Sequence, residues 1–407
     1  MKLAISKAEL IIILGSLTAL APLSIDMYLP AFTSLERLFT TDTGHVQLTL
    51  SSFFVAFSAG QLIYGPLADR YGRKVVLYAG LSIYVVTSLW CTFATTINEL
   101  IILRFFQALG ASASVVIARA VVSDLYTARD AAGIYSAMML VMGAAPMLAP
   151  LMGGYLMEWF GLDAIFEALA LFGGLALLLV HYRLQESHGA DPQIPLTPHT
   201  ILSRYLSLLK NRHFIGYTLA GGLSMASLFA YIASSPFILI DHFGIEVENF
   251  GWFFSTNAMG FILFGQLNGW ALKYKTPLQI ISVAIIVQLT ISLILMLQSW
   301  MSGELFSVLV PLFFQIGLLG FLVPNMTALG MAHFKANAGV ASALMGSTQF
   351  LIAGIVSMIV SAIHSNAPET LAVTMLACTV GAFLIFQFMC HHVASRETLI
   401  PTTKNSV

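Results

Sequence analysis

Two charged side chains stand inside long apolar runs of the sequence, where charge is costly. Asp26 lies in the first run and Arg104 in the fourth. A charge at the centre of a membrane helix costs at least ~2.5–3.5 kcal/mol, so each residue should face a cavity or a partner. By helical rise both lie about 8–9 Å from the same boundary. This predicts a shared site in which Asp26 carries a proton and Arg104 changes how tightly it is held. The alternatives are a headgroup carboxylate at Asp26 and a snorkelling side chain at Arg104.

The composition indicates which elements position these residues. Of the 407 residues, 58% are hydrophobic and only 9% are charged, whereas a soluble domain carries roughly 25% charged residues. Apolar runs of ~20 residues span a bilayer as helices, and barrel strands would alternate apolar and polar residues instead. We therefore expect an all-α polytopic protein whose partner is the lipid bilayer. A formal net charge of −1 argues against a nucleic-acid partner.

Twelve spans and one long connection divide the chain. The spans are predicted at about 8–32, 46–66, 75–96, 98–119, 132–156, 162–182, 213–238, 249–271, 277–298, 304–325, 337–362 and 369–391. We expect an N-terminal six-helix bundle (1–182), a cytoplasmic linker (183–212), a C-terminal six-helix bundle (213–391) and a cytoplasmic tail (392–407).

Basic residues gather on one side of the predicted spans, and this asymmetry predicts the orientation. The opposite loops hold Arg37 as their one basic residue and several acids instead. Both termini are therefore expected in the cytoplasm. The basic side carries Lys2, Lys7, Arg70, Arg73, Lys74, Arg129, Arg183, Arg204, Lys210, Arg212, Lys273, Lys275, Lys335, Arg396 and Lys404.

The two halves repeat each other. Gly60-Gln61-Leu62 returns as Gly265-Gln266-Leu267, and Phe105-Phe106-Gln107 returns as Phe313-Phe314-Gln315. Six spans in each half make the repeat parallel, about an axis along the membrane normal, with a central cavity between the halves. The side chains expected to line this cavity are Tyr28, Gln107, Gln315 and Asn325.

The loop between the second and third spans combines glycines with both signs of charge. Its glycines allow a tight turn, and Asp69 can face the positive N-terminus of a helix. Arg73 has a candidate partner in Asp124. The alternative is a basic loop that only sets topology. The predicted gate residues are Gly65, Asp69, Arg70, Gly72, Arg73, Lys74 and Asp124.

The fifth span is rich in proline and glycine. Proline removes a backbone hydrogen bond and bends a helix, while paired glycines let a neighbouring helix approach. The alternative is ordinary packing of small residues. The residues concerned are Gly143, Pro146, Pro150, Gly153 and Gly154.

These stretches carry a family resemblance. Residues 65–74 resemble the loop signature of the major facilitator superfamily, residues 103–110 resemble its second signature, and the fifth span resembles its antiporter signature. Ser24-Ile25-Asp26-Met27-Tyr28-Leu29-Pro30-Ala31 resembles the bicyclomycin/chloramphenicol-resistance group of drug:proton antiporters.

The resemblance implies a proton-coupled efflux antiporter for small, partly apolar compounds in the bacterial inner membrane. It implies alternating access, a monomer and no cofactor, with small-molecule substrates and protons as partners. It also implies that Asp69 docks near Asn337, at the start of the eleventh helix.

Other functions remain open at this point. The nearest is an exporter of one native metabolite, such as a siderophore, sugar or amino-acid derivative; a proton symporter for uptake fits the fifth span less well. An enzyme would need a converging set of His, Asp and Glu side chains, and the sequence contains none. Its cysteines, Cys91, Cys378 and Cys390, have no metal-ligand spacing, so no metal site is expected.

Overall fold

The computed structural model describes residues 6–126, 128–191, 198–301, 304–332, 334, 338–363 and 367–391, and these residues form helices and no strand. The elements are α1 (Lys7–Asp26), η1 (Leu29–Ala31), α2 (Phe32–Leu38), α3 (Thr43–Tyr71), α4 (Arg73–Cys91), α5 (Ile97–Leu125), α6 (Ala128–Phe160), α7 (Asp163–Tyr182), α8 (Pro198–Leu209), α9 (Arg212–Pro236), η2 (Phe237–His242), α10 (Val247–Ala271), α11 (Pro277–Met301), α12 (Leu305–Met331), α13 (Ala338–Ile363), α14 (Pro368–Ile385) and η4 (Phe386–His391).

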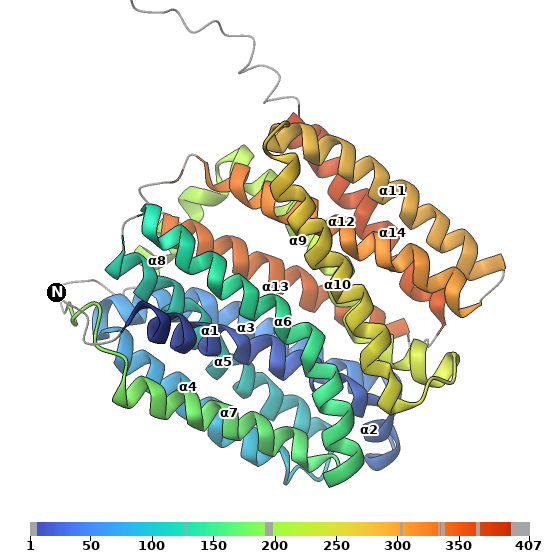
Figure 1. The fold of residues 1–407 in the computed structure, drawn as a ribbon, viewed down its shortest axis with the longest axis horizontal. Coiled ribbons are helices and arrows are strands. Elements are labelled where there is room, and N and C mark those ends of the chain that lie inside the picture. Colours follow the sequence, from blue (N-terminus) through green and yellow to red (C-terminus); the bar gives the residue numbers. More distant parts are fainter. Residues whose placement is uncertain are drawn as a thin grey trace, which may run out of the picture.

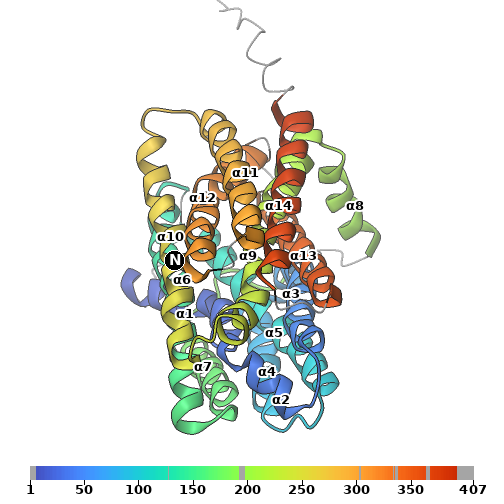
Figure 2. The same cartoon turned by 90° about the vertical axis from the view of Figure 1, so that its right-hand side faces the viewer.

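The helices pack in two sets that follow the chain. α1 and α3–α7 pack on one another, and so do α9–α14. Figure 1 shows the first set in blue to green and the second in yellow to red, and Figure 2 shows the same division from the side. The sets meet mainly where α3 lies against α13 and where α6 lies against α10. This all-helical arrangement confirms the predicted fold class.

Each predicted span coincides with a long helix. Ten helices of the described residues are long and apolar enough to cross a membrane; α6 and α10 are not among them. α10 is less apolar because it carries Asn257, Gln266 and Asn268. The two helices pack against each other across the boundary between the two sets.

Side-chain caps fix several helix starts. Ser6 and Glu9 form a reciprocal capping box at α1, and Thr96 and Glu99 form another at α5. The Asp42 carboxylate accepts a hydrogen bond from the His45 amide at the start of α3. These short polar residues satisfy amide groups that have no partner within the helix, so they set where each span begins.

The first predicted span was too long as a single helix. α1 ends at Asp26, and the chain resumes as η1 after Met27 and Tyr28. Pro30 has no amide hydrogen and cannot continue the α-helical hydrogen-bond pattern. Asp26 is therefore the last residue of its helix rather than five or six residues inside it.

We call the end of the molecule with residues 65–74 and α8 the linker end, and the opposite end the far end. The two sets touch at the far end. The Gln47 amide nitrogen donates to the carbonyl of Ala233 at 3.4 Å, and the Ser361 hydroxyl donates to the carbonyl of Gly44 at 2.6 Å. The rings of Phe32 and Phe237 lie 5.8 Å apart. In this conformation the far end is closed.

Candidate functional site

Arg104 lies fully buried in the first set of helices. Its Nη2 donates to the carbonyl of Ser24 at 2.8 Å, and its Nη1 donates to Oε1 of Gln107 at 2.5 Å. Its Cζ lies 4.5 Å from the ring centre of Tyr28 and 4.6 Å from that of Phe53. Two acceptors and two aromatic faces therefore hold this cation without a carboxylate.

The Arg104 contacts extend into a buried polar network that joins α1, α4 and α5. Gln107 donates through Nε2 to the Ser88 hydroxyl at 2.7 Å. The Ser24 and Tyr84 hydroxyls share a hydrogen bond of 2.7 Å. Because buried polar groups are costly without partners, this network fixes the three helices relative to one another.

Asp26 lies at the junction of the two sets and is 3% exposed. Its Oδ1 has no hydrogen-bond partner. Among the described residues it forms no ion pair with Arg104. The predicted Asp26–Arg104 pair is therefore not formed in this conformation.

Tyr231 of α9 and Asn257 of α10 form a polar pair beside Asp26. The Tyr231 hydroxyl accepts a hydrogen bond of 2.9 Å from Nδ2 of Asn257, and its ring stacks on Phe254 at 5.4 Å. Tyr231 is 2% exposed. This pair was not predicted from the sequence: each is a polar residue in a span, but nothing in the sequence indicates that they meet.

The predicted Arg73–Asp124 pair is present at the linker end. Arg73 donates through Nε and Nη2 to both carboxylate oxygens of Asp124, at 3.0 and 3.3 Å, and through Nη1 to Asp69 at 2.6 Å. Gly72 between α3 and α4 has φ 91°, a conformation that favours glycine. The proposed docking partner of Asp69, Asn337, lies outside the described residues.

Residues just after α7, which were not predicted from the sequence, complete this loop cluster. The Glu186 carboxylate accepts hydrogen bonds from the amides of Arg73 and Lys74 at 2.8 and 3.0 Å. The Ser187 hydroxyl donates to Asp124 at 2.9 Å. A carboxylate is favoured at a helix N-terminus, so Glu186 ties the linker to the start of α4. Of the other predicted loop residues, Gly65 has open space where a Cβ would stand. The Arg70 carbonyl accepts a hydrogen bond from the Asp191 amide.

The proline and glycine residues of α6 lie where this helix meets the second set and the end of α1. A Cβ on Gly153 would stand 2.0 Å from the carbonyl oxygen of Met27, whereas one on Gly154 would find no atom closer than 3.5 Å. The Ser255 hydroxyl of α10 donates to the carbonyl of Met147, one residue after Pro146. Pro150 is buried and Gly143 lies further toward the linker end. Gly153 therefore permits contact between α6 and the turn after Asp26.

The four predicted cavity-lining residues are all buried in this conformation. Tyr28 and Gln107 contact Arg104 as described, while Gln315 donates to the Thr379 hydroxyl at 3.1 Å and Asn325 to Oδ1 of Asn268 at 2.7 Å. Their place along a cavity stays a prediction. The second copy of the Phe-Phe-Gln sequence thus also uses its glutamine for a buried hydrogen bond.

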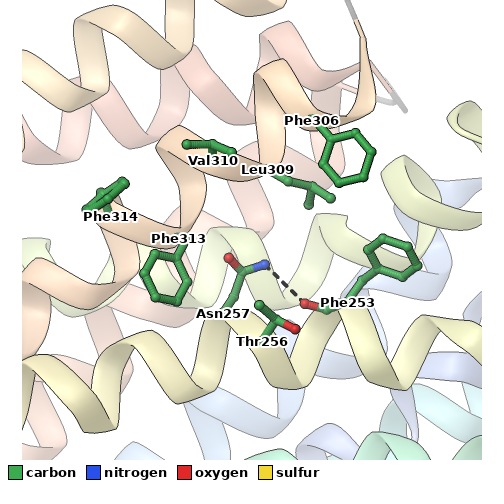
Figure 3. A pocket seen from close by; sticks show the side chains of 8 residues that line it. All are labelled: Phe253, Thr256, Asn257, Phe306, Leu309, Val310, Phe313 and Phe314. Carbon is green, nitrogen blue, oxygen red and sulfur yellow. Dashed lines mark hydrogen bonds between the residues drawn. The ribbon is translucent and has the colours of Figure 1, made fainter.

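A pocket of about 430 Å³ opens between α10 and α12. Figure 3 shows its lining side chains, which include phenylalanine rings and the Asn257 amide. Phe306, Val310 and Phe314 are exposed on helix α12, which is apolar enough to span a membrane, so the pocket faces the bilayer. Its lining is Phe253, Thr256, Asn257, Phe306, Leu309, Val310, Phe313 and Phe314.

The described residues contain no group of three or more His, Cys, Asp or Glu side chains able to hold a metal ion. Cys91, Cys378 and Cys390 are buried and unpaired.

Comparison with known proteins gives consistent matches along the whole chain. The family model described as Major Facilitator Superfamily matches residues 14–358. The MFS-type transporter YdgK of Bacillus subtilis is 32% identical over 386 residues, covering 93% of this chain and 95% of that protein. The bicyclomycin resistance protein homolog of Haemophilus influenzae is 30% identical over 379 residues, with coverage of 93% and 95%. A solved bacterial homolog of the human lysosomal transporter Spinster is 15% identical, superposes with a TM-score of 0.73 and covers 96% of this chain and 98% of its own.

Proposed function

The chain belongs to the major facilitator superfamily, and we propose that it is a proton-coupled efflux antiporter for small, partly apolar compounds. As a family member it is a multi-pass membrane transporter and not an enzyme. To this family assignment the proposal adds the direction of transport, the coupling ion and the class of substrate. Its location would be a bacterial inner membrane, with both termini in the cytoplasm, and it would act as a monomer.

The observation that carries this proposal is the environment of Asp26. A carboxylate buried between two mobile halves, with an oxygen that lacks a hydrogen-bond partner, is costly when charged. The halves of such transporters rock about a central site. Rocking would expose Asp26 to water on one side and bury it again on return, which suits a proton carrier.

The proposed substrate class is supported by the names of two relatives and by the side chains between the two halves. One relative is named a bicyclomycin resistance protein homolog, and another, 31% identical over 274 residues, is named a chloramphenicol resistance protein from Pseudomonas aeruginosa. Aromatic rings of the two halves meet at the junction; the ring centres of Phe54 and Phe229, for example, lie 4.5 Å apart. Such surroundings favour compounds with substantial apolar surface.

Proton release from inside-out membrane vesicles tests this proposal. Vesicles containing the protein are acidified internally by respiration and followed with a pH-sensitive acridine dye. Adding bicyclomycin or chloramphenicol should restore the dye fluorescence, because each exported molecule enters the vesicle in exchange for protons. Vesicles without the protein are the control. Uptake of the compounds without any proton movement would contradict coupling, and no response to either compound would favour a dedicated metabolite exporter.

Asp26→Asn tests the assigned proton carrier. We expect the variant to reach the membrane in normal amounts and to lose proton-coupled exchange, because an amide cannot bind and release a proton in this pH range. The measurement is the same dye assay across pH 6 to 8, alongside the amount of folded protein. Normal pH-dependent exchange by this variant would place the proton site elsewhere.

A further inference from the structure

The two helices that line the pocket, α10 and α12, approach each other closely on the side of it that faces the linker end. A Cβ on Gly320 of α12 would stand 2.6 Å from the amide nitrogen of Gly265, and one on Gly260 of α10 would stand 2.9 Å from Cε2 of Phe313. Glycines therefore let the two helices meet at this level. From Phe313 toward the helix starts, the side chains leave the pocket of about 430 Å³ open.

The pocket lies in the half of the bilayer nearer the far end. α10 begins at Val247, shortly after η2, whose Phe237 contacts the other half at the far end. At a rise of about 1.5 Å per residue, Asn257 lies about 15 Å along α10, and Phe313 lies about 12 Å along α12. The hydrocarbon layer is about 30 Å thick. The pocket therefore extends from the helix starts to about the middle of the membrane, and a ligand reaches it from the lipid rather than from water.

One polar atom of the pocket lining has no hydrogen bond. Nδ2 of Asn257 donates to the Tyr231 hydroxyl at 2.9 Å and to the carbonyl of Phe253 at 3.4 Å. Oδ1 of Asn257 accepts no hydrogen bond from the described residues, although this residue is only 2% exposed. Figure 3 shows the Asn257 side chain directed from α10 toward α12. The hydroxyl of Thr256, the other polar residue of the lining, donates to the carbonyl of Trp252 at 2.9 Å. The pocket therefore presents one free acceptor, held in place through the bonds of its own amide nitrogen.

The rest of the lining is aromatic and aliphatic, with phenylalanine as its commonest residue. Ligand sites of this size are typically apolar, with a few polar groups that orient the ligand, and aromatic rings pack well against another ring. A lipid acyl chain would cover the apolar lining but would leave Oδ1 of Asn257 without a donor, which is costly for a buried acceptor. The lining therefore favours a ring compound that carries one hydrogen-bond donor.

We propose that the pocket between α10 and α12 is a bilayer-facing binding site for small aromatic compounds with a single hydroxyl or N–H group, such as phenols. The ring lies among the phenylalanine side chains, and the donor group forms a hydrogen bond to Oδ1 of Asn257. The lining comes from the second set of helices alone, so the site is separate from the junction that holds Asp26. Binding there requires neither proton coupling nor export, and the inference therefore goes beyond the proposed function.

Photolabelling of the full-length protein in phospholipid nanodiscs tests this site. The probe is a phenol that carries a trifluoromethyl-diazirine group on its ring, and its methyl ether is the matched compound without the donor. Labelled peptides are identified by mass spectrometry, and each probe concentration is expressed as a mole fraction in the lipid. We expect the phenol to label residues 253–257 and 306–314 saturably. Half-maximal labelling should need roughly tenfold less phenol than ether, which is the effect of one hydrogen bond to a buried acceptor.

Two pairs of variants identify the acceptor and the pocket. Asn257→Leu removes the acceptor, so the phenol should bind no more tightly than the ether. Thr256→Val makes a polar-to-apolar change at the next residue and should keep the difference between the probes.

The second pair fills the pocket from the lipid side. Val310→Trp, at a position that is 54% exposed, should abolish saturable labelling of both segments without disturbing the core. Val283→Trp, on α11 and 64% exposed, should leave the labelling unchanged. Because Val310 is exposed, this pair decides the question even if Asn257→Leu yields little folded protein.

Three results would overturn this inference. Equal labelling by the phenol and the ether in the unmodified protein would show that the pocket takes any apolar molecule, including a lipid acyl chain. Labelling that rises in proportion to concentration, or that persists in Val310→Trp, would come from probe dissolved in the bilayer. A preference for the phenol that survives Asn257→Leu would place the acceptor elsewhere. None of these measurements involves transport, so they are independent of whether the protein exchanges protons.

Discussion

At the scale of single residues, the two buried charges of the first half have separate tasks in this conformation. Arg104 satisfies the Ser24 carbonyl and Gln107 and lies against two aromatic rings. Asp26 lacks comparable partners. A buried cation that donates to two acceptors supports the packing of the helices around it, whereas a buried carboxyl without such partners is suited to binding and releasing a proton.

Arg104→Lys tests the structural task. A lysine keeps the charge but lacks the planar fork that reaches two acceptors at once, so one buried acceptor should lose its donor. We expect a loss of about 1–3 kcal/mol in the free energy of unfolding, measured as resistance to thermal denaturation in detergent. Arg37→Lys, at an exposed position on α2, is the control. If both variants have the same stability, the network around Arg104 does not support the fold.

At the scale of elements, the contact between α6 and the turn after α1 depends on one missing side chain. A methyl group at Gly153 would meet the Met27 carbonyl oxygen at 2.0 Å, but Gly154 next to it has room. In the first half α6 therefore reaches the backbone immediately after Asp26, the proposed proton carrier. A movement of α6 against α10 would therefore act on Met27, the residue next to Asp26.

Gly153→Ala should separate α6 from this turn and weaken closure of the far end. Overpacking of this kind costs about 1–3 kcal/mol, so the exchange rate should fall roughly tenfold. The measurement is exchange in reconstituted vesicles, normalised to the amount of folded protein. Gly154→Ala, with the same change in volume one residue later, should retain the normal rate. A normal rate in both variants would mean that α1 and α6 adjust without loss of function.

At the scale of the whole molecule, the connection between the halves is fastened to the first half at two places. Glu186 caps the start of α4, and the Tyr205 hydroxyl of α8 donates to the carbonyl of Leu62 in α3 at 3.2 Å. Tyr205 and Leu208 of α8 also share a core with the start of α13. The linker is therefore a packed element between the halves at this end of the molecule.

Glu186→Gln tests the fastening at α4. Loss of the negative charge weakens two charge-assisted hydrogen bonds at a helix N-terminus. Amide hydrogen exchange should rise in residues 73–76 and 184–191, with insertion and total helix content unchanged. Glu158→Gln, at an exposed position near the end of α6, should change neither segment. Unchanged exchange in 184–191 would show that other contacts hold the linker.

Much of the architecture could be read from the sequence because membranes restrict backbone structure. With no water in the hydrocarbon layer, apolar runs must become helices, so the fold class and each span were predictable from composition and length alone. The Arg73–Asp124 pair was also predictable, since Arg73 and Asp124 come at the ends of neighbouring spans on the same side. Gln107 and Gln315 of the repeated Phe-Phe-Gln sequence were predicted to line a cavity, and this stays a prediction.

Only the tertiary structure decided which polar groups meet. In the sequence, Glu186 cannot be distinguished from other acidic residues in connections; its role follows from the folding of the linker onto α4. Tyr231 and Asn257 are distant in the sequence from Asp26. The end of α1 at Asp26 depends on a local break that hydropathy does not register, because the residues on both sides are apolar. Hydropathy predicts that a segment lies in the membrane because it sums local transfer energies. A hydrogen bond between two helices depends instead on the distance and direction between their side chains, and the order of the helices in the sequence does not determine how they are arranged in space.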